Sequence, residues 1–569
     1  MDKHTITAGF NYELFKFENS FNLFYYPWAT AFSANDFVNN NFVYFVDNTG
    51  LNTGDLNQDV VNAQANDYLW SYVDVAQLAV YVQDEFRVND KLNITGGLRI
   101  DMPMYFNDIE TADNAAAIQE VKDFDGWVDE DGNSVDVDPG SWPDSKILWS
   151  PRLGFNYDVK NDNTIQVRGG TGIFSGRIPF VWLGNQSSNS GMYPGYFFQV
   201  NATSSDFKWP QVWKTNLAVD MIFGEGWKAS IEGIYGKDLN AIVHRNYNMA
   251  PPSGQLTGTG DNRAIFAGFN EVNIYSADAD AIGFLDAGTI VLDNTDEGYQ
   301  FSLTQKLGKT FDFGLMLDVA YTYMESKDYT SIPAEIAADA FQRNPVVGNP
   351  NDPQLSWSRY GLQHRIIASA LYKIEYGKMA TSFALFFEAG KGDRYSYVYS
   401  GDLNQDAIVN NDLLYVPENS SDITLVDYVD AGGNTVTAAE QWTALNAFIE
   451  QDDYLSERRG KYAERNGAML PWFTTFDIRL AQDFKFDLMG KENKFQLTLD
   501  LLNAGNLINS DWGVRQFATT YTPITVNSVD PATGLHDFRF DTNLTESYTD
   551  DVSVLSKWQL QIGFRYIFN

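Results

Sequence analysis

The chain has 569 residues and a formal net charge of −36, from 75 acidic and 39 basic side chains. A surface this acidic repels phosphate backbones, so we expect no nucleic-acid partner. Cysteine is absent, which excludes disulfides and thiolate zinc sites, and no run of about 18 apolar residues offers a transmembrane helix.

The first predicted element is an alternating segment, and similar segments recur to the C-terminus. TITAGFNYELF (5–15) places Ile6, Phe10 and Leu14 on one face and mostly polar residues on the other. Further examples in chain order are LNITGGLRID (92–101), SPRLGFNYDV (150–159), FDFGLMLDVAYTY (311–323), KFQLTLDLLN (494–503) and WQLQIGFRYIFN (558–569). Alternation with a period of two predicts β-strands with one apolar face. We predict about fourteen strands, beginning near residues 4, 70, 92, 147, 164, 209, 227, 298, 311, 360, 379, 471, 493 and 556.

These strands are long for a soluble protein. The segment 311–323, tilted by about 45°, would span about 30 Å, which matches the hydrocarbon core of a bilayer. Strands of globular proteins usually have about five or six residues. Alternation alone, however, also fits a soluble sheet with one buried face.

The connections between the strands separate these two alternatives. Tight connections are predicted at 88–91, 160–163, 223–226, 307–310, 375–378 and 488–493. Between the strand pairs lie segments of roughly 20 to 75 residues, rich in Asp, Asn, Gly and Ser. Short turns that alternate with long loops are typical of outer-membrane barrels, with the turns on the periplasmic side. We therefore predict an all-β protein, a transmembrane antiparallel β-barrel with long extracellular loops.

The last strand is predicted to descend to the periplasm and to present its aromatic side chains to lipid. We expect Phe564, Tyr566 and Phe568 to act in addition as the terminal signal that the outer-membrane assembly machinery reads.

Several longer segments resemble one family. They are YVQDEFRVNDKLNITGGLRID (81–101), SPRLGFNYDV, IQVRGGTGIFSGRIPFVWLGNQ (165–186), FKWPQVWKTNLAVD (207–220), GDLNQDAIVNNDLLYVP (401–417), RRGKYAERNGAMLPW (458–472) and LTLDLLNAGNLINSDWG (497–513). In combination they resemble the barrel of TonB-dependent outer-membrane transporters of the Bacteroidota type, whose members carry an N-terminal carboxypeptidase-regulatory-like domain. The resemblance extends along nearly the whole chain.

The resemblance implies a 22-strand barrel, an N-terminal plug and a box that contacts TonB. Because about fourteen strands and no plug are recognised here, we interpret residues 1–569 as the C-terminal part of such a barrel. The implied function is energised uptake of a large or scarce nutrient across the outer membrane of a Gram-negative bacterium. The implied partners are outer-membrane lipid, the N-terminal plug and barrel portion, the TonB complex through that portion, and a surface lipoprotein. Two alternatives stay open, namely a passive porin-like channel and a surface adhesion or assembly scaffold.

The segment GDLNQDAIVNNDL (401–413) is the sharpest local motif. Asp402, Asn404, Asp406, Ile408 and Asn410 occupy loop positions 1, 3, 5, 7 and 9, and Asp412 follows. This spacing aims oxygen ligands at one hard cation such as Ca²⁺. Ala407 stands where such loops have a turn glycine, and the final acid comes one residue early. The alternative is an Asx-rich turn that needs no ion, and no other cofactor is expected.

Charged residues at inward positions of the predicted strands form the second candidate site. They are expected to line the lumen and to contact the plug or the passing substrate: Arg99, Asp101, Arg168, Asp318, Asp477, Arg479, Asp500 and Arg565. Arg458, Arg459 and Arg465, in RRGKYAERNG (458–467), are expected at the barrel mouth. There they would bind a carboxylate or phosphate, or brace the wall.

Other segments have simpler interpretations. The segment 107–146 carries twelve acidic residues and two lysines, which indicates either capture of cationic ligands or, as we favour, a solvated loop. Helical spacing in 437–455 predicts a short amphipathic helix. The aromatic segments 191–200 and 393–401 are assigned to the interfacial girdle rather than to ligand stacking. The four histidines are scattered, with His364 expected near the barrel mouth beside Arg365, and we expect no enzyme activity.

Overall fold

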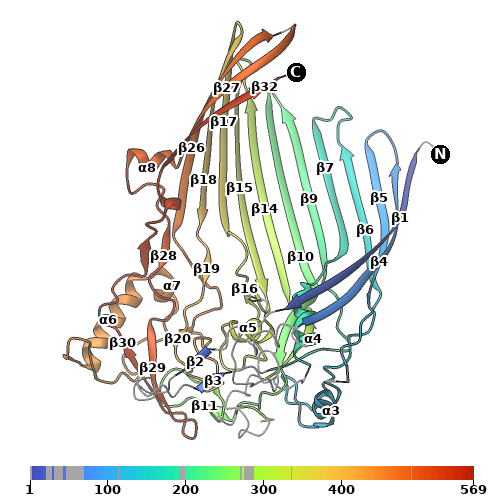
Figure 1. The fold of residues 1–569 in the computed structure, drawn as a ribbon. Coiled ribbons are helices and arrows are strands. Elements are labelled where there is room, and N and C mark those ends of the chain that lie inside the picture. The colour runs from blue at the N-terminus through green and yellow to red at the C-terminus, as the bar shows by residue number, and fades with distance from the viewer. Residues whose placement is uncertain are drawn as a thin grey trace.

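The computed structural model describes residues 3–20, 28–30, 43–45, 70–112, 114–190, 199–268, 272–274, 288–332, 334, 336–488 and 490–568. Long strands of one sheet dominate this part of the chain (Figure 1). Those with nine or more residues are β1 (His4–Ser20), β4 (Trp70–Arg87), β5 (Leu92–Tyr105), β6 (Leu148–Asp158), β7 (Ile165–Ser175), β9 (Gln211–Phe223), β10 (Trp227–Asn246), β14 (Gly298–Thr310), β15 (Leu315–Asp328), β17 (His364–Tyr376), β18 (Met379–Lys391), β26 (Trp472–Leu488), β27 (Lys491–Leu502) and β32 (Gln559–Ile567). The described residues thus contain fourteen such strands, and their beginnings confirm the predicted positions to within about four residues.

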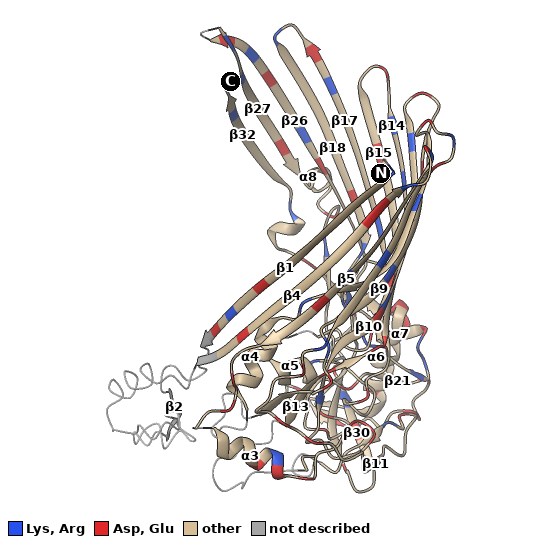
Figure 2. Cartoon of the chain, turned by 90° about the vertical axis from the view of Figure 1, so that its right-hand side faces the viewer, with Lys and Arg blue, Asp and Glu red and all other residues tan. Residues whose placement is uncertain are grey.

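Each long strand pairs antiparallel with the next long strand along the chain, from β1–β4 to β27–β32. This simple meander is the topology of an outer-membrane barrel wall. The sheet curves around an open interior, and β1 and β32 form its two separate edges (Figure 2). The predicted transmembrane β architecture is therefore confirmed, with a sheet that is open in this structure.

Short and long connections lie at opposite ends of the sheet. The tight turns, together with the start of β1 and the end of β32, gather at one end, and the long connections with most of the described helices gather at the other (Figure 1). The turns between β4 and β5, β6 and β7, β9 and β10, β17 and β18, and β26 and β27 fall at the predicted places. The short and long connections that alternate along the sequence thus lie at opposite ends of the sheet.

One predicted turn is wrong. We expected 307–310 to be the turn and 311–323 to be strand, but β14 continues to Thr310 and β15 begins only at Leu315. The turn is formed by 311–314, where Gly314 has a φ of 96° and the Phe311 amide donates to the Leu315 carbonyl at 2.8 Å. A positive φ favours glycine. Phe311 and Phe313 extend the apolar alternation of the sequence into the turn, where their rings pack against each other.

The register of the strands places the apolar rows on the outer surface. Leu497 stands opposite Phe564 and Leu499 opposite Ile562, so each row continues from strand to strand. Phe10 and Phe564 are 78% and 71% exposed, which is far from the burial of a soluble core. Removing apolar surface from water is favourable by about 25 cal/mol per Å². An apolar face of this extent therefore needs a nonaqueous environment. The hydrocarbon interior of a membrane supplies it.

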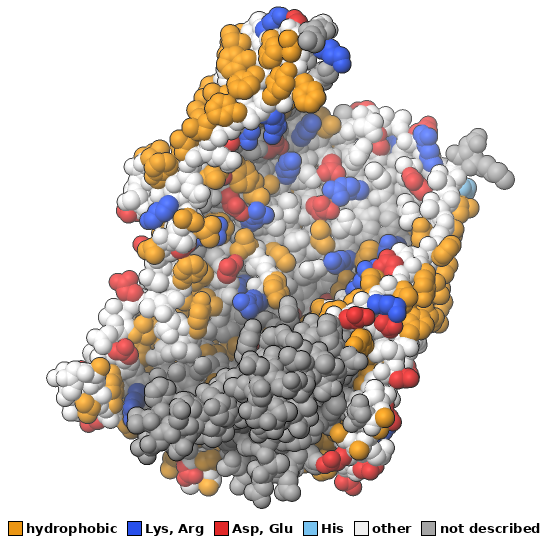
Figure 3. Space-filling view, viewed as in Figure 1, with side chains coloured by type: hydrophobic (Ala, Val, Ile, Leu, Met, Phe, Trp, Pro, Cys, Tyr) orange, Lys and Arg blue, Asp and Glu red, His pale blue; other side chains and the backbone are white. Residues whose placement is uncertain are grey.

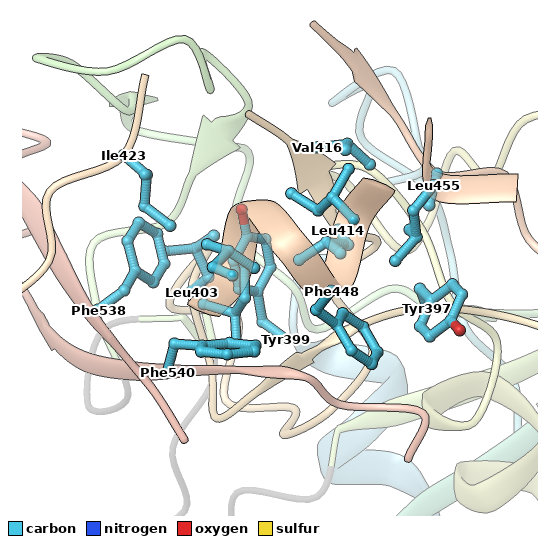
Figure 4. Close-up of a cluster of buried hydrophobic side chains, with 14 of the residues drawn as sticks. Tyr397, Tyr399, Leu403, Leu414, Val416, Ile423, Phe448, Leu455, Phe538 and Phe540 are labelled. Carbon is cyan, nitrogen blue, oxygen red and sulfur yellow. The ribbon is translucent and has the colours of Figure 1, made fainter. Parts of the chain in front are cut away.

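The connections at the other end fold into a lobe that has a dry core of its own. Tyr397, Tyr399, Leu414, Phe448 and Phe538 are buried members of one cluster, in which the Tyr399 ring stacks on Phe538 (Figure 4). The first four come from the connection 392–471 and Phe538 comes from 503–558, and the core also includes Leu256 and Ile265 from a third connection, 247–297. We call this region the loop lobe.

The connections between the long strands contain the helices and short strands of the described residues. The helices are α3 (Ala115–Asp123), α4 (Phe180–Ser188), α5 (Ala337–Gln342), α6 (Ala438–Gln451), α7 (Asp453–Ser456), α8 (Ala504–Ile508) and the 3₁₀ helix η2 (Val554–Ser556). The short strands are β2 (Trp28–Thr30), β3 (Val43–Phe45), β8 (Val200–Thr203), β11 (Gly254–Gln255), β12 (Ala264–Ile265), β13 (Thr289–Thr295), β16 (Ser356–Trp357), β19 (Arg394–Tyr395), β20 (Tyr399–Ser400), β21 (Tyr415–Val416), β22 (Tyr428–Val429), β23 (Thr435–Val436), β24 (Lys461–Tyr462), β25 (Ala468–Met469), β28 (Gln516–Ala518), β29 (Ile524–Val529), β30 (His536–Phe540) and β31 (Tyr548–Asp550). None of the helices in the described part of the chain has the length and hydropathy needed to cross a membrane.

Helix α6 confirms the helix predicted within 437–455. The Thr437 hydroxyl accepts the Glu440 amide, and the Glu440 carboxylate accepts the Thr437 amide, which together form a capping box. Leu445, Phe448 and Ile449 lie on its buried face and enter the core of the loop lobe.

Candidate functional site

The concave face of the sheet carries charged side chains at the predicted inward positions. Figure 3 shows Lys, Arg, Asp and Glu scattered over a hollowed face, with hydrophobic side chains gathered along the edges of the sheet. Because neighbouring strands are paired in register, inward side chains on adjacent strands lie close enough to contact one another on the same face of the wall.

Arg99 and Asp101 belong to a network near the β1 edge. The Arg99 guanidinium donates to Asp101 at 2.8 Å, and the Gln77 amide donates to the same carboxylate at 2.9 Å. Arg177 joins Gln77 to Glu13. Asp101 is only 1% exposed, so its charge is held by these donors.

Arg168 is the centre of a second network. It donates to Asp220 on β9 at 2.8 Å and to Glu232 on β10 at 3.0 Å. Ser230 and Asn216 donate to the same two carboxylates at 2.6 and 3.1 Å. One arginine thus braces three strands.

The remaining inward residues lie along the same face toward the β32 edge. Asp318 is 3.6 Å from Lys306, and Arg479 is 3.4 Å from Asp500. Asp477 accepts the Asn503 amide at 2.8 Å. Arg565 stands opposite Gln496 in the register, without an ion pair to any residue in the described ranges. The structure thus brings these side chains onto one face, while their contact with a plug or a substrate stays a prediction.

His364 lies near the barrel mouth, as we expected, but its side chain does not contact that of Arg365. It stands at the loop end of β17, but on the outer face, where its Nδ1 is 2.8 Å from the Tyr321 hydroxyl and its ring stacks on Trp472. Arg365 points to the opposite face and pairs with Glu388 at 2.8 Å. Adjacent strand residues face opposite ways, so the two cannot share one site. The aromatic rings around His364 form part of an outer aromatic band.

The three arginines predicted at the mouth separate into different environments. Arg458 pairs with Glu464, and Arg459 donates to Asn446 of α6 at 2.9 Å, so both brace the loop lobe. Arg465 is only 2% exposed and donates to Asn344 at 2.7 Å and to Asp328 at 2.8 Å.

Arg465 also lines a pocket of about 330 Å³ in the loop lobe. Arg343, Arg359 and Arg394 line the same pocket. Sequence reasoning did not find these three residues, because each is a single arginine in a separate stretch of loop. No local motif connects them.

The predicted calcium loop is built as a chain of Asx turns. Asp402 accepts the amides of Asp406 and Ala407 at 3.2 and 3.0 Å, and Asp406 accepts the Ile408 amide at 2.8 Å. Asn410 accepts the Gly401 amide at 3.0 Å. Ala407 has a φ of 69°, so it adopts the conformation for which such loops use glycine.

Two features of this loop bear on whether it could hold Ca²⁺. Asp412, the predicted closing ligand, accepts from Arg263 at 2.9 Å and from two backbone amides, so it already has a cationic partner. Across the part of the chain that the structure describes, no three His, Cys, Asp or Glu side chains are arranged to hold a metal ion. Burial and the neighbouring Asp412 nevertheless raise the pKa of Asp402 to about 7. A cation would relieve this repulsion, and calcium stays a prediction.

The predicted assembly residues Phe564 and Tyr566 lie on the outer face of β32, and Phe568 follows the last residue of that strand. Phe564 and Phe568 are 71% and 73% exposed, and the Tyr566 hydroxyl donates to Asn493 at 2.7 Å. Their orientation is the one expected, and their role as a signal stays a prediction.

The acidic segment 107–146 is partly neutralised within the loop lobe. Glu130 pairs with Arg245 at 2.7 Å, and Lys122 with Asp138 at 3.3 Å. Asp113 in this segment, and 191–198 of the predicted aromatic segment 191–200, lie outside the described residues.

Comparison with known proteins places this geometry in context. The family model described as an outer membrane beta barrel domain matches residues 1–194 and 178–531. Similar solved structures include the FrpB iron transporter from Neisseria meningitidis (12% identity, 89% of this chain and 49% of that chain, TM-score 0.40). They also include the outer membrane transporter YddB from Escherichia coli (11%, 88% and 46%, 0.42) and the siderophore receptor PirA from Acinetobacter baumannii (11%, 88% and 48%, 0.39). The chain spans about half the length of these structures. No curated protein matches the chain.

Proposed function

The chain belongs to the outer membrane beta-barrel domain family, and from this premise we propose that it forms the wall and outer lobe of a TonB-energised importer. In this proposal the loop lobe captures a nutrient at the cell surface. The concave wall then surrounds a plug, which TonB pulls at the expense of the inner-membrane proton gradient. The substrate is a large or scarce nutrient.

The observation that carries this proposal is the register of the sheet, which separates an apolar outer face from a charged inner face. Most inward charges are paired along the wall, as Arg168 is with Asp220 and Glu232. A polar wall of this kind is suited to surround a polar insert without binding it irreversibly. The folded core of the loop lobe supports capture, because it holds a preformed outer surface.

The segments that resemble TonB-dependent transporters favour this function over its alternatives. A passive porin and a surface adhesion scaffold would both use a barrel in the outer membrane, but neither needs TonB. The role of this chain in energised uptake therefore depends on an experiment that separates all three.

The experiment compares a strain that lacks this gene, a strain that lacks TonB and the double mutant. Each strain is grown on a panel of single limiting nutrients, and an antibody confirms that the strain lacking only TonB still displays the chain at its surface. Transport predicts the same growth defect on the same nutrient in all three strains. A porin predicts a further defect in the double mutant, and an adhesion scaffold predicts no nutrient-specific defect at all. Either of the last two results would overturn the proposal.

A further inference from the structure

The pocket in the loop lobe is basic, although the chain as a whole has a net charge of −36. Its volume is about 330 Å³, at the lower end for pockets that hold small organic ligands. Four of its lining residues are arginines: Arg343, Arg359, Arg394 and Arg465. A concentration of guanidinium groups in a hollow is costly unless anions neutralise it.

The chain supplies carboxylates for only two of these arginines. Arg465 pairs with Asp328 at 2.8 Å, and Arg343 with Asp339 at 2.7 Å. Within the described ranges no carboxylate lies within 4.0 Å of Arg359 or Arg394. Two of the four arginines therefore have no ion-pair partner within 4.0 Å among the described residues, although Glu464 and Glu325 act on Arg394 from a greater distance.

Arg394 is held in place without an acid. Its side chain lies over the Trp357 ring at 3.8 Å, and its Nη1 donates to the Asn466 carbonyl at 3.1 Å. Only 8% of the residue is exposed, and burial lowers its pKa to about 10, so it is still charged at neutral pH. Stacking on tryptophan fixes the plane of the guanidinium and leaves its other N–H groups available.

Arg465 contributes a second, independent sign of a ligand. Its Nε is buried and has no hydrogen-bond partner, although the residue is only 2% exposed. A buried N–H group without an acceptor costs about 1–3 kcal/mol. The Nε is closed to solvent, so an anion bound in the pocket would become its acceptor only after the lining residues shift.

The pocket is built as a binding site, with a rigid floor and an open rim. Arg394, Arg465 and Asn344 are buried, whereas Arg359 and Tyr521 are exposed. The walls come from the three connections 329–363, 392–471 and 503–558. The core of the loop lobe holds the last two together, and Arg465 and Asn466 donate hydrogen bonds to Asn344 and to the Trp357 carbonyl in the first. The arginines are thus preorganised before a ligand arrives, which reduces the entropy cost of binding.

We propose that this pocket binds a small organic anion with at least two carboxylate or phosphate groups. The buried Arg394 and Arg465 hold one anionic group, and the exposed Arg343 and Arg359 hold the other. Planar, forked guanidinium groups recognise both chemistries in a bidentate manner. The inference rests on the proposed function in one respect, namely that the bound anion is what the importer captures.

The test is calorimetric titration of the full chain in detergent at 150 mM NaCl. The probes are citrate for carboxylates, glucose 6-phosphate for phosphates, and acetate as a single-charge control. We expect saturable binding of citrate or glucose 6-phosphate, with acetate at least 100-fold weaker. The tighter of the two probes identifies the anionic group.

Matched variants assign the binding to the pocket. Arg394→Lys keeps the charge but loses the fork, and the double variant Arg343→Gln/Arg359→Gln changes only exposed side chains, so that its folding is preserved. We expect each to weaken binding at least tenfold. Arg539→Gln, an exposed arginine of the same lobe outside the pocket, should bind as the unmodified chain does.

The proposed anion site would be rejected if neither citrate nor glucose 6-phosphate bound the chain, or if all variants bound the probe equally well. Because the titration uses purified protein, that result would leave TonB-dependent growth intact. Conversely, anion binding together with growth that does not depend on TonB would reject only the transport proposal.

Discussion

The guanidinium of Arg168 on β7 lies 3.0 Å from the carboxylate of Glu232 on β10, although β9 separates the two strands. The same arginine reaches Asp220 on the intervening strand at 2.8 Å. This contact fixes the relative positions of three strands on the inner face of the wall.

We expect Arg168→Ala to destabilise the wall, because it leaves two carboxylates facing each other without a cation. The side chains are about a third exposed, so solvent screening limits the loss to about 1–2 kcal/mol. Urea unfolding from lipid vesicles would measure it. Arg565→Ala removes an inward arginine that has no ion pair within the described residues, and should change stability by less than about 0.5 kcal/mol. Equal losses in the two variants would contradict this account.

Val319→Arg tests the outer face of β15. Val319 is 43% exposed and lies in the half of β15 nearer the tight turn, so an arginine there should cost up to about 2–4 kcal/mol, the cost found at the centre of a bilayer. Ser369→Arg is the control, since Ser369 stands opposite Asp318 on the inner face and beside Val319 in the sheet. We expect the control to cost less than about 1 kcal/mol in the same vesicle assay. A control as costly as Val319→Arg would mean that both faces are dry.

The two interpretations of the loop 402–412 predict different results when Ca²⁺ is titrated into the protein in a calorimeter. If the loop binds Ca²⁺, calorimetry should show saturable binding that is lost in Asp406→Asn, because Asp406 is 1% exposed at the centre of the motif. If it is an Asx-rich turn alone, no heat should appear with either protein. Asp537→Asn, which changes an acidic residue elsewhere in the same lobe, should leave any heat unchanged. Heat that persists in Asp406→Asn would place the ion elsewhere.

His244 makes the loop lobe sensitive to acid. It lies in the part of β10 that pairs with β13, its two ring nitrogens are buried without partners, and burial lowers its pKa to about 4. The unfolded chain, with a histidine pKa of about 6.5, binds one more proton between these values. Stability should therefore be complete above pH 6.5 and fall by up to about 3 kcal/mol as the pH approaches 4.

His244→Phe isolates this contribution. Phenylalanine fits an apolar site beside Trp182, whose ring lies 5.3 Å from the histidine ring, and it cannot take up a proton. The difference in urea stability between the two proteins, followed by tryptophan fluorescence, should grow as the pH falls from 7 to 4. A difference that does not change with pH would show that His244 is not responsible.

The strands could be predicted from sequence because each carries its own signal. Alternation in LNITGGLRID needs no knowledge of the neighbouring strand, and the Thr437–Glu440 spacing of α6 is equally local. The turn at 311–314 was missed for a related reason, since Phe311 and Phe313 imitate the alternation while Gly314 ends it.

The candidate sites could be predicted only in part. Inward positions such as Asp101 follow from strand parity, but their partners do not, because Gln77 and Arg177 depend on the pairing of separate strands. His364 shows the same limit, since the face of a strand residue at its end depends on the register. The basic pocket is formed by three connections that are distant in sequence. The local sequence around each of its arginines does not distinguish that residue from an ordinary solvent-exposed arginine.

The central claim is that the odd-numbered face of β15 touches acyl chains, while its even-numbered face is wet. Because the chain has no cysteine, single cysteines at 315–322 can each carry a nitroxide label in lipid vesicles. Electron paramagnetic resonance then compares collisions with oxygen, which is concentrated in lipid, and with a water-soluble nickel complex. We predict that oxygen access peaks at Leu315, Leu317, Val319 and Tyr321, and that nickel access peaks at the residues between them. Equal access to nickel on both faces, or no alternation at all, would contradict the account.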